Sequence, residues 1–174
     1  DKYGMPHSIT AWMHKDNVAS WTWPGYEGKP ANVDVYSEAE EVELLLNGTS
    51  LGRKPAGEKH GFMATYEMTY EPGELLAVSY CNGEETGRDV LYTAGEKVQM
   101  QVDCEGEVLK ADGADLAFLT VKLTDDKGID NLFAQKEITV TVEGAGTLQG
   151  FGNADPRAIG SYDDTTWKTF DGYV

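Results

Sequence analysis

The sequence predicts an all-β protein made of two tandem antiparallel β-sandwiches. Apolar residues recur at every second position in almost every periodic run, which is the spacing of a half-buried strand. Turn signals such as Asn47-Gly48 and Asn82-Gly83 separate these runs. We find no convincing amphipathic helix, so we expect short strands and almost no helix.

The first half contains several predicted strands. Val33 and Val35 alternate with polar neighbours, and the apolar run 42–46 is followed by Asn47-Gly48, the preferred two-residue type I′ hairpin turn. Asn47-Gly48-Thr49 is also a formal glycosylation sequon, but we interpret it as the turn. A long strand over 62–70 places one set of residues on a common face: Phe62, Ala64, Tyr66, Met68 and Tyr70.

The second half shows the same alternation of apolar and polar residues, but its sequence is not a repeat of the first half. Strands are predicted over 98–104, 117–123 and 138–142, with a break near 93–97. We therefore expect a linker or docking arm at 1–17, one sandwich at 18–94 and a second at 95–174. Residues 170–174 look like the start of a last strand, so we expect the second sandwich to be truncated at its C-terminal end. The first residue is Asp1 rather than Met, which suggests a piece of a longer protein.

The charge and hydropathy of the chain exclude some classes of function. The chain has 14 Lys and Arg against 30 Asp and Glu, a net charge of −16, so neither a nucleic-acid partner nor an anionic membrane partner is expected. The mean hydropathy is −0.44, and no apolar run is long enough for a transmembrane helix.

The cysteines and histidines point to no metal or cofactor. Cys81 and Cys104 lie in strand-like runs on either side of the predicted domain boundary, which favours two buried thiols over a disulfide. Reduced thiols fit a reducing compartment, and cytoplasm is therefore the slightly favoured location. His7, His14 and His60 are scattered without the spacing of zinc ligands.

One aromatic group is the best candidate for a binding function. Trp21 and Trp23 are two residues apart and would share a face in a strand, with Tyr26 close behind. Sugars stack on aromatic rings through their apolar C–H faces, and Glu27 could accept hydrogen bonds from sugar hydroxyls. The alternative is that both indoles pack in a core or a domain interface. We expect at least one of them to be more exposed than a core tryptophan.

Two further motifs are interpreted as turns. Asp112-Gly-Ala-Asp115 and Asp125-Asp-Lys-Gly128 carry oxygens that could suit Ca²⁺, but the strand between them separates the two clusters by roughly 30 Å. Gly150-Phe-Gly-Asn-Ala-Asp-Pro156 lacks the strand–loop–helix context of a nucleotide-binding loop. We expect it to be a loop that needs positive φ, with Asn153 and Asp155 bonded to their own backbone.

An ordered series of motifs, spread over roughly residues 18–172, resembles the C-terminal region of family 2 glycoside hydrolases of the β-galactosidase type. The motifs are Ser20-Trp-Thr-Trp-Pro-Gly-Tyr-Glu-Gly28, Val33-Asp-Val-Tyr-Ser37, Val42-Glu-Leu-Leu-Leu-Asn-Gly-Thr-Ser-Leu-Gly-Arg-Lys54, Tyr70-Glu-Pro-Gly-Glu-Leu75, Lys110-Ala-Asp-Gly-Ala-Asp-Leu116 and Glu143-Gly-Ala-Gly-Thr-Leu-Gln-Gly-Phe-Gly-Asn-Ala-Asp-Pro156.

This resemblance implies two immunoglobulin-like domains that follow a catalytic TIM barrel in a bacterial enzyme. The family is retaining, and its two catalytic glutamates lie at the C-terminal face of the barrel. No stretch here matches the family's catalytic motifs, so no catalytic residue is assigned. The resemblance therefore implies a non-catalytic region that serves domain packing or assembly, with the barrel as its partner. Two alternatives remain: a carbohydrate-binding module for the parent enzyme, and a tandem stalk of a bacterial surface protein.

Overall fold

The computed structural model describes residues 17–106 and 108–174. Most of the predicted arm at 1–17, with His7, Trp12 and His14, lies outside the described residues. The chain divides into two compact units: unit 1 comprises Asp1–Trp21 and Tyr26–Leu91, and unit 2 comprises Thr22–Gly25 and Tyr92–Val174. We describe each unit by itself.

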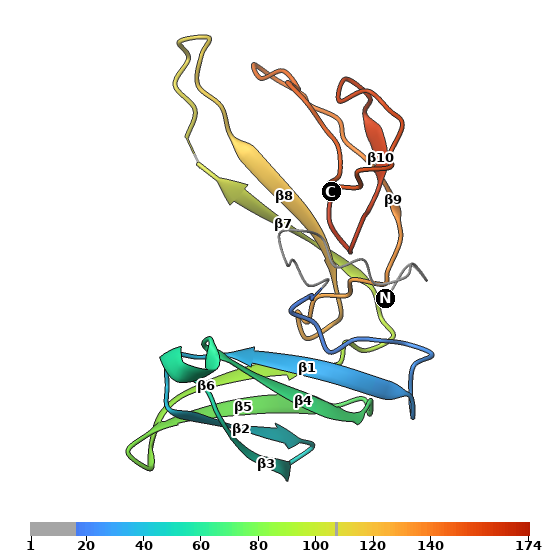
Figure 1. Cartoon of the computed structure of the whole chain (residues 1–174). Coiled ribbons are helices and arrows are strands. Elements are labelled where there is room, and N and C mark those ends of the chain that lie inside the picture. The colour runs from blue at the N-terminus through green and yellow to red at the C-terminus, as the bar shows by residue number, and fades with distance from the viewer. Residues whose placement is uncertain (1–16, 107) are drawn as a thin grey trace. The chain divides into compact units, whose positions relative to one another are not determined.

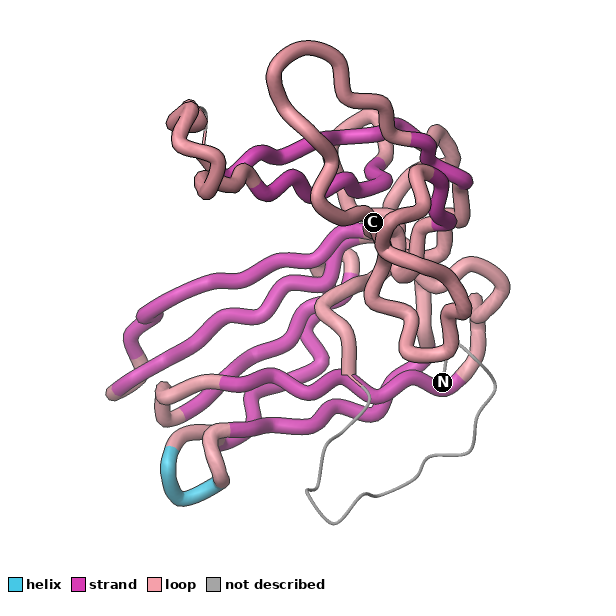
Figure 2. The backbone as a smooth tube through the Cα atoms, turned by 90° about the horizontal axis from the view of Figure 1, so that it is seen from above, coloured by secondary structure: helices cyan, strands magenta, loops and turns pink. Residues whose placement is uncertain are grey.

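The described residues of unit 1 form six strands in two antiparallel layers (Figure 1). The strands are β1 (Pro30–Tyr36), β2 (Glu41–Leu46), β3 (Thr49–Pro55), β4 (Met63–Thr69), β5 (Glu74–Cys81) and β6 (Glu84–Tyr92). Strands β1 and β4 form one sheet, and the other has the order β3-β2-β5-β6. A short 3-10 turn, η1 (Glu58–His60), lies between β3 and β4 and is drawn in cyan in Figure 2.

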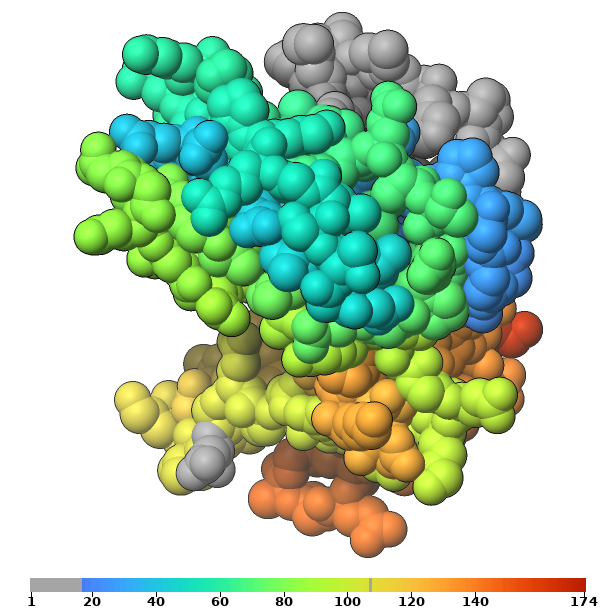
Figure 3. Space-filling model, turned by 90° about the horizontal axis from the view of Figure 1, so that it is seen from below, coloured from blue at the N-terminus to red at the C-terminus, as the bar shows by residue number. Residues whose placement is uncertain are grey.

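The β2–β3 hairpin confirms the predicted turn. Asn47 and Gly48 have φ values of 50° and 77°, the left-handed conformation that a type I′ turn requires. The Asn47 side chain also fastens the β4–β5 connection: it accepts the Glu74 N–H at 2.9 Å and donates to the Pro72 carbonyl at 3.1 Å. In the space-filling view, the cyan atoms of this hairpin form part of a continuous surface of unit 1 (Figure 3).

Strand alternation fills the core of unit 1 from both sheets. Val42, Leu44 and Leu46 of β2 are buried, while the residues between them are not. Tyr66 of β4 is buried against this face, and its hydroxyl donates to the Val42 carbonyl at 2.7 Å. The aromatic ring thus fills the space between the layers while its polar atom remains satisfied.

Unit 2 has shorter and fewer strands in its described residues. They are β7 (Gln99–Glu105), β8 (Phe118–Thr124), β9 (Glu137–Thr139) and β10 (Thr166–Lys168), which pair as two antiparallel two-stranded sheets, β7-β8 and β9-β10. Its buried residues gather at the C-terminal end of β8 and near β10: Leu123, Thr124, Asp125 and Thr169, together with Thr22. All of β7 is exposed.

The prediction of an all-β antiparallel fold is confirmed. The assignment of domain boundaries and of two immunoglobulin-like domains after a barrel stays a prediction. Within the described residues, no helix is long and apolar enough to cross a membrane.

Three local predictions are wrong. Phe62 leaves the predicted strand face because its φ of 59° turns the chain just before β4, and its side chain is exposed. The strand predicted over 138–142 is only three residues long, Glu137–Thr139. Cys104 is an exposed free thiol rather than a buried one, because the β7 face that carries it is uncovered. Cys81 is also a free thiol, and it is half-buried.

Candidate functional site

Trp21 is a core residue of unit 1. Only 4% of its surface is exposed, and its indole Nε1 donates to the Glu71 carbonyl at 3.0 Å. Its ring packs edge-on against Tyr70 at a centroid distance of 4.9 Å, and the Tyr70 hydroxyl donates back to the Trp21 carbonyl. Trp21 is thereby fixed by packing and by hydrogen bonds at both its ring and its backbone.

Trp23 packs in unit 2. Its ring meets Phe133 edge-on at 5.4 Å, and it is half-buried. Residues 21–23 form no strand, so the expectation that the two indoles share a strand face is wrong. The backbone instead passes from one unit to the other between Trp21 and Thr22 and returns to unit 1 at Tyr26.

Tyr26 and Glu27 lie in a turn of unit 1. The Lys29 ammonium lies 4.4 Å from the centre of the Tyr26 ring, and the Lys29 N–H donates to the Tyr26 carbonyl at 3.0 Å. Glu27 is exposed. The four residues proposed as a sugar contact are thus divided between two units, and a sugar contact by any of them stays a prediction.

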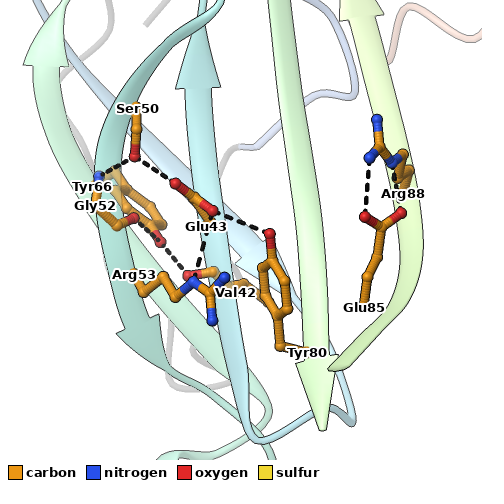
Figure 4. Close-up of polar contacts among 9 residues, drawn as sticks. All are labelled: Val42, Glu43, Ser50, Gly52, Arg53, Tyr66, Tyr80, Glu85 and Arg88. Carbon is orange, nitrogen blue, oxygen red and sulfur yellow. Dashed lines mark hydrogen bonds and ion pairs between the residues drawn. The ribbon is translucent and has the colours of Figure 1, made fainter. Parts of the chain in front are cut away.

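A polar cluster lies on the outer face of the four-stranded sheet and centres on Glu43 of β2 (Figure 4). Its carboxylate accepts from the Ser50 hydroxyl at 2.6 Å and from the Tyr80 hydroxyl at 3.1 Å. Arg53 Nε lies 3.6 Å from the same carboxylate, and the guanidinium lies 3.5 Å from the centre of the Tyr80 ring. The cluster links β3, β2 and β5 across one face of the sheet.

The electrostatics of this cluster hold Glu43 ionised. The hydrogen bond from Ser50, then that from Tyr80, and the charge of Arg53 lower the Glu43 pKa below its ordinary value. A general acid needs the opposite shift, because it must hold its proton near neutral pH. The guanidinium also covers the Tyr80 ring, which a sugar would need for stacking. This arrangement stabilises the sheet and offers neither an acid nor an open aromatic platform.

A second carboxylate, Asp125 of unit 2, fastens a loop. Asp125 is buried, and it accepts the backbone N–H groups of Gly95, Lys127 and Ile129 at 2.8–2.9 Å. Burial alone would raise its pKa, but the three backbone donors lower the pKa below the ordinary value. All the oxygen atoms of this side chain are engaged by the protein itself, which is the pattern of a structural carboxylate.

The other acidic turn behaves as predicted. Asp112 accepts the N–H groups of Ala114 and Asp115, and Asp115 accepts that of Lys110. These carboxylates therefore form turns. Among the described residues, no three His, Cys, Asp or Glu side chains are grouped so that they could hold a metal ion.

The glycine-rich loop over 150–156 is structural, but the contact that requires its glycine could not be predicted from the sequence. Asn153 accepts the Asp155 N–H and Asp155 accepts the Arg157 N–H, as expected. The positive φ predicted for this loop is found at neither Gly150 nor Gly152. A Cβ at Gly152 would instead lie 2.5 Å from ring atoms of Tyr162, which stacks on Trp167. Close approach to an aromatic ring is what requires this glycine.

Sequence reasoning missed the Glu43 cluster and the role of Asp125. The outward position of Glu43 was readable, because it is the charged residue between two apolar ones, Val42 and Leu44, in a run predicted as a strand. Its partner Tyr80 was not readable, because only the pairing of β2 with β5, which places Glu43 beside Val78, brings Tyr80 near. Asp125 was recognised only as a turn residue.

Two family models match the chain. Residues 28–87 match "Domain of unknown function (DUF4982)", and residues 100–174 match "Glycoside hydrolase family 2 C-terminal domain 5". A similar protein of Bacteroides ovatus, named Beta-galactosidase BoGH2A, is 32% identical over 158 residues, which cover 87% of this chain and 18% of that protein.

Solved structures give the same result. A glycosyl hydrolase family 2 member from Bacteroides cellulosilyticus is 40% identical, with a TM-score of 0.89 over 93% of this chain and 21% of that chain. A beta-glycosidase from Bacteroides vulgatus is 28% identical, with a TM-score of 0.79 over 90% of this chain and 20% of that chain. The chain thus spans about a fifth of the length of these relatives.

Proposed function

The chain belongs to the C-terminal regions of glycoside hydrolase family 2 proteins, and from this premise we propose that it is a non-catalytic packing region of a β-galactosidase-like enzyme. The parent would hydrolyse terminal β-galactosides or related glycans with two glutamates of its barrel, by a retaining mechanism. This chain would support that barrel as a partner within the same polypeptide.

The observation that carries this proposal is the family match over 100–174, together with relatives that extend well beyond this chain. The pKa shifts of two well-bonded carboxylates, Glu43 and Asp125, agree with this proposal. Retaining hydrolysis needs two carboxyl groups about 5–5.5 Å apart, one of them with a raised pKa. Glu43 and Asp125 both have lowered pKa values and hold hydrogen bonds within the protein. Neither is suited to donate a proton to a leaving group.

The test of a non-catalytic role is turnover by the purified chain. We expect no hydrolysis of a nitrophenyl β-galactoside above background. In the full-length enzyme, Glu43→Gln should leave kcat unchanged, because Glu43 serves the sheet surface. Turnover by the chain that survives repurification, or a kcat lost with Glu43→Gln in a protein that still folds, would contradict the proposal.

The test of the packing role is the stability of the barrel. Deleting residues 18–174 from the full-length enzyme should lower the temperature at which the barrel unfolds, because it would expose barrel surface that this region covers. An unchanged barrel transition would contradict a packing role.

Retardation of the chain in a galactan gel, lost with Trp23→Ala, would instead support the carbohydrate-binding alternative.

A further inference from the structure

Two hairpins of unit 1 carry the same turn dipeptide. Asn47-Gly48 joins β2 to β3, and Asn82-Gly83 joins β5 to β6 (Figure 1). The φ values are 50° and 77° in the first turn and 52° and 80° in the second, so both turns have the positive φ angles of type I′. Both dipeptides are exposed. The two turns therefore form a matched pair in sequence, in backbone φ and in exposure.

An asparagine followed by glycine can react with its own backbone. The glycine nitrogen attacks the side-chain carbon Cγ, the bond between Cγ and the amide nitrogen breaks, and ammonia leaves with the proton of the glycine N–H. Glycine permits this close approach because it has no Cβ beside the attacking nitrogen. Water then opens the cyclic succinimide at one of its two carbonyls and yields aspartate or isoaspartate. The reaction consumes only water, and nothing is oxidised or reduced.

The carboxamide of Asn47 is held away from this reaction. Its Oδ1 accepts the Glu74 N–H at 2.9 Å, and its Nδ2 donates to the Pro72 carbonyl at 3.1 Å. The carboxamide also packs on Gly73 so closely that a Cβ at Gly73 would collide with it. Both hydrogen bonds must break before Cγ can turn towards the Gly48 nitrogen. The reaction at Asn47 therefore requires local opening of unit 1.

The carboxamide of Asn82 has no such anchor. No described residue forms a hydrogen bond with this side chain. The Asn82 backbone N–H donates to Glu40 Oε2 at 2.6 Å, but this contact holds the main chain and leaves the side chain free to rotate. Position in the sheet does not separate the two turns, because each joins an inner strand to an edge strand in the order β3-β2-β5-β6.

We propose that Asn82 is a deamidation site of this protein, and that Asn47 is protected in the same dipeptide by its two side-chain hydrogen bonds. Either product places a new carboxylate near that of Glu40, and isoaspartate also adds a main-chain carbon to a two-residue turn. The β5–β6 hairpin therefore changes chemically as the protein ages, while the β2–β3 hairpin is preserved. This inference is independent of the proposed function.

The test compares the two sites within one molecule. The folded 174-residue chain is incubated in warm, mildly alkaline buffer, and the peptides that contain Asn47 and Asn82 are followed by mass spectrometry for the mass gain of deamidation. We expect Asn82 to react at least about 10-fold faster than Asn47, because two hydrogen bonds must open at Asn47. In denaturing urea the two rates should become similar, since the unfolded chain anchors neither side chain.

A substitution at Gly73 tests the cause of the protection. Gly73→Ala places a Cβ where the Asn47 carboxamide lies and should displace it from its two partners. Asn47 should then react at a rate close to that of Asn82, whose own rate is the internal reference and should not change. Because Gly73 has a φ of 134°, alanine is strained there, and urea denaturation first establishes that the variant folds. The comparison of folded chain with urea stands without this variant.

Three outcomes would overturn the proposal. The first is equal deamidation of Asn47 and Asn82 in the folded chain. The second is a faster reaction at Asn82 that persists unchanged in urea, which would assign the difference to neighbouring sequence rather than to the hydrogen bonds. The third is an Asn47 that stays unreactive in folded Gly73→Ala, which would show that the two side-chain hydrogen bonds are not what protects it.

Discussion

Units 1 and 2 use the same strand pattern with different results. In unit 1, the alternating residues of β2 meet those of β4, and Val42, Leu44 and Tyr66 are the most deeply buried side chains. In unit 2, the equally regular alternation of β7 leaves Met100 and Val102 exposed. Period-two alternation thus identifies a strand and its core face, but a second layer must be present for that face to be buried.

The largest expected difference between the units comes from one substitution made in each. Leu44→Ala in unit 1 should cost about 3 kcal/mol of unfolding free energy, because it empties a fully buried site. Leu119→Ala in unit 2 of the 174-residue chain should cost less than about 0.5 kcal/mol, because Leu119 is exposed. Urea denaturation of both variants gives the two values, and equal costs would break the comparison.

The second comparison concerns carboxylates within unit 2. Asp125→Ala should cost about 2 kcal/mol, because it removes a buried carboxylate that accepts three part-buried backbone N–H groups. Asp112→Ala should cost about 1 kcal/mol or less, since the N–H groups that it caps are exposed and can bond to water. Thermal unfolding of the two variants measures the difference. A cost for Asp112→Ala equal to that of Asp125→Ala would show that burial does not decide the effect.

Removal of one tyrosine hydroxyl should also cost different amounts of unfolding free energy in the two units. Tyr66→Phe should cost about 1 kcal/mol, because the Val42 carbonyl loses a buried hydrogen-bond donor. Tyr162→Phe in unit 2 keeps the stacking on Trp167 and removes an exposed hydroxyl, so its effect should be close to zero. Chemical denaturation measures both variants. A neutral Tyr66→Phe would mean that this hydrogen bond adds nothing to the packing between the two sheets of unit 1.

A further difference between the units is a response of unit 2 to alkaline pH. Burial, and then the hydrogen bond to Asp130, raise the pKa of Tyr173 to about 12. A raised folded-state pKa contributes stability below the unfolded value, near 10, and this contribution is lost as the pH rises towards 12. Stability of unit 2 should therefore fall over that window in the parent chain and stay flatter in Tyr173→Phe. Identical pH profiles for the two proteins would refute this role of Tyr173.

The sequence predicted the local features of the fold better than the pairing between distant segments. Asn47-Gly48 specifies its hairpin through two positive φ angles, and Tyr66 falls on the core face by simple alternation. The placement of Trp21 and Trp23 could not be read, because a chain that crosses between two units at that point follows no local period. Glu43 likewise acquires its role from Tyr80, which only the β2–β5 pairing brings near.

Native-state hydrogen exchange of the 174-residue chain tests the central comparison most directly. The amides of β2 and β5 should exchange only through global unfolding of unit 1, because both strands lie inside the four-stranded sheet and line a covered core. The amides of β7 and the Leu119 end of β8 should exchange far faster, through local opening of an uncovered hairpin. Equal protection of the two sets would contradict the account, since it would show that the apolar face of β7 and β8 is already covered within this chain.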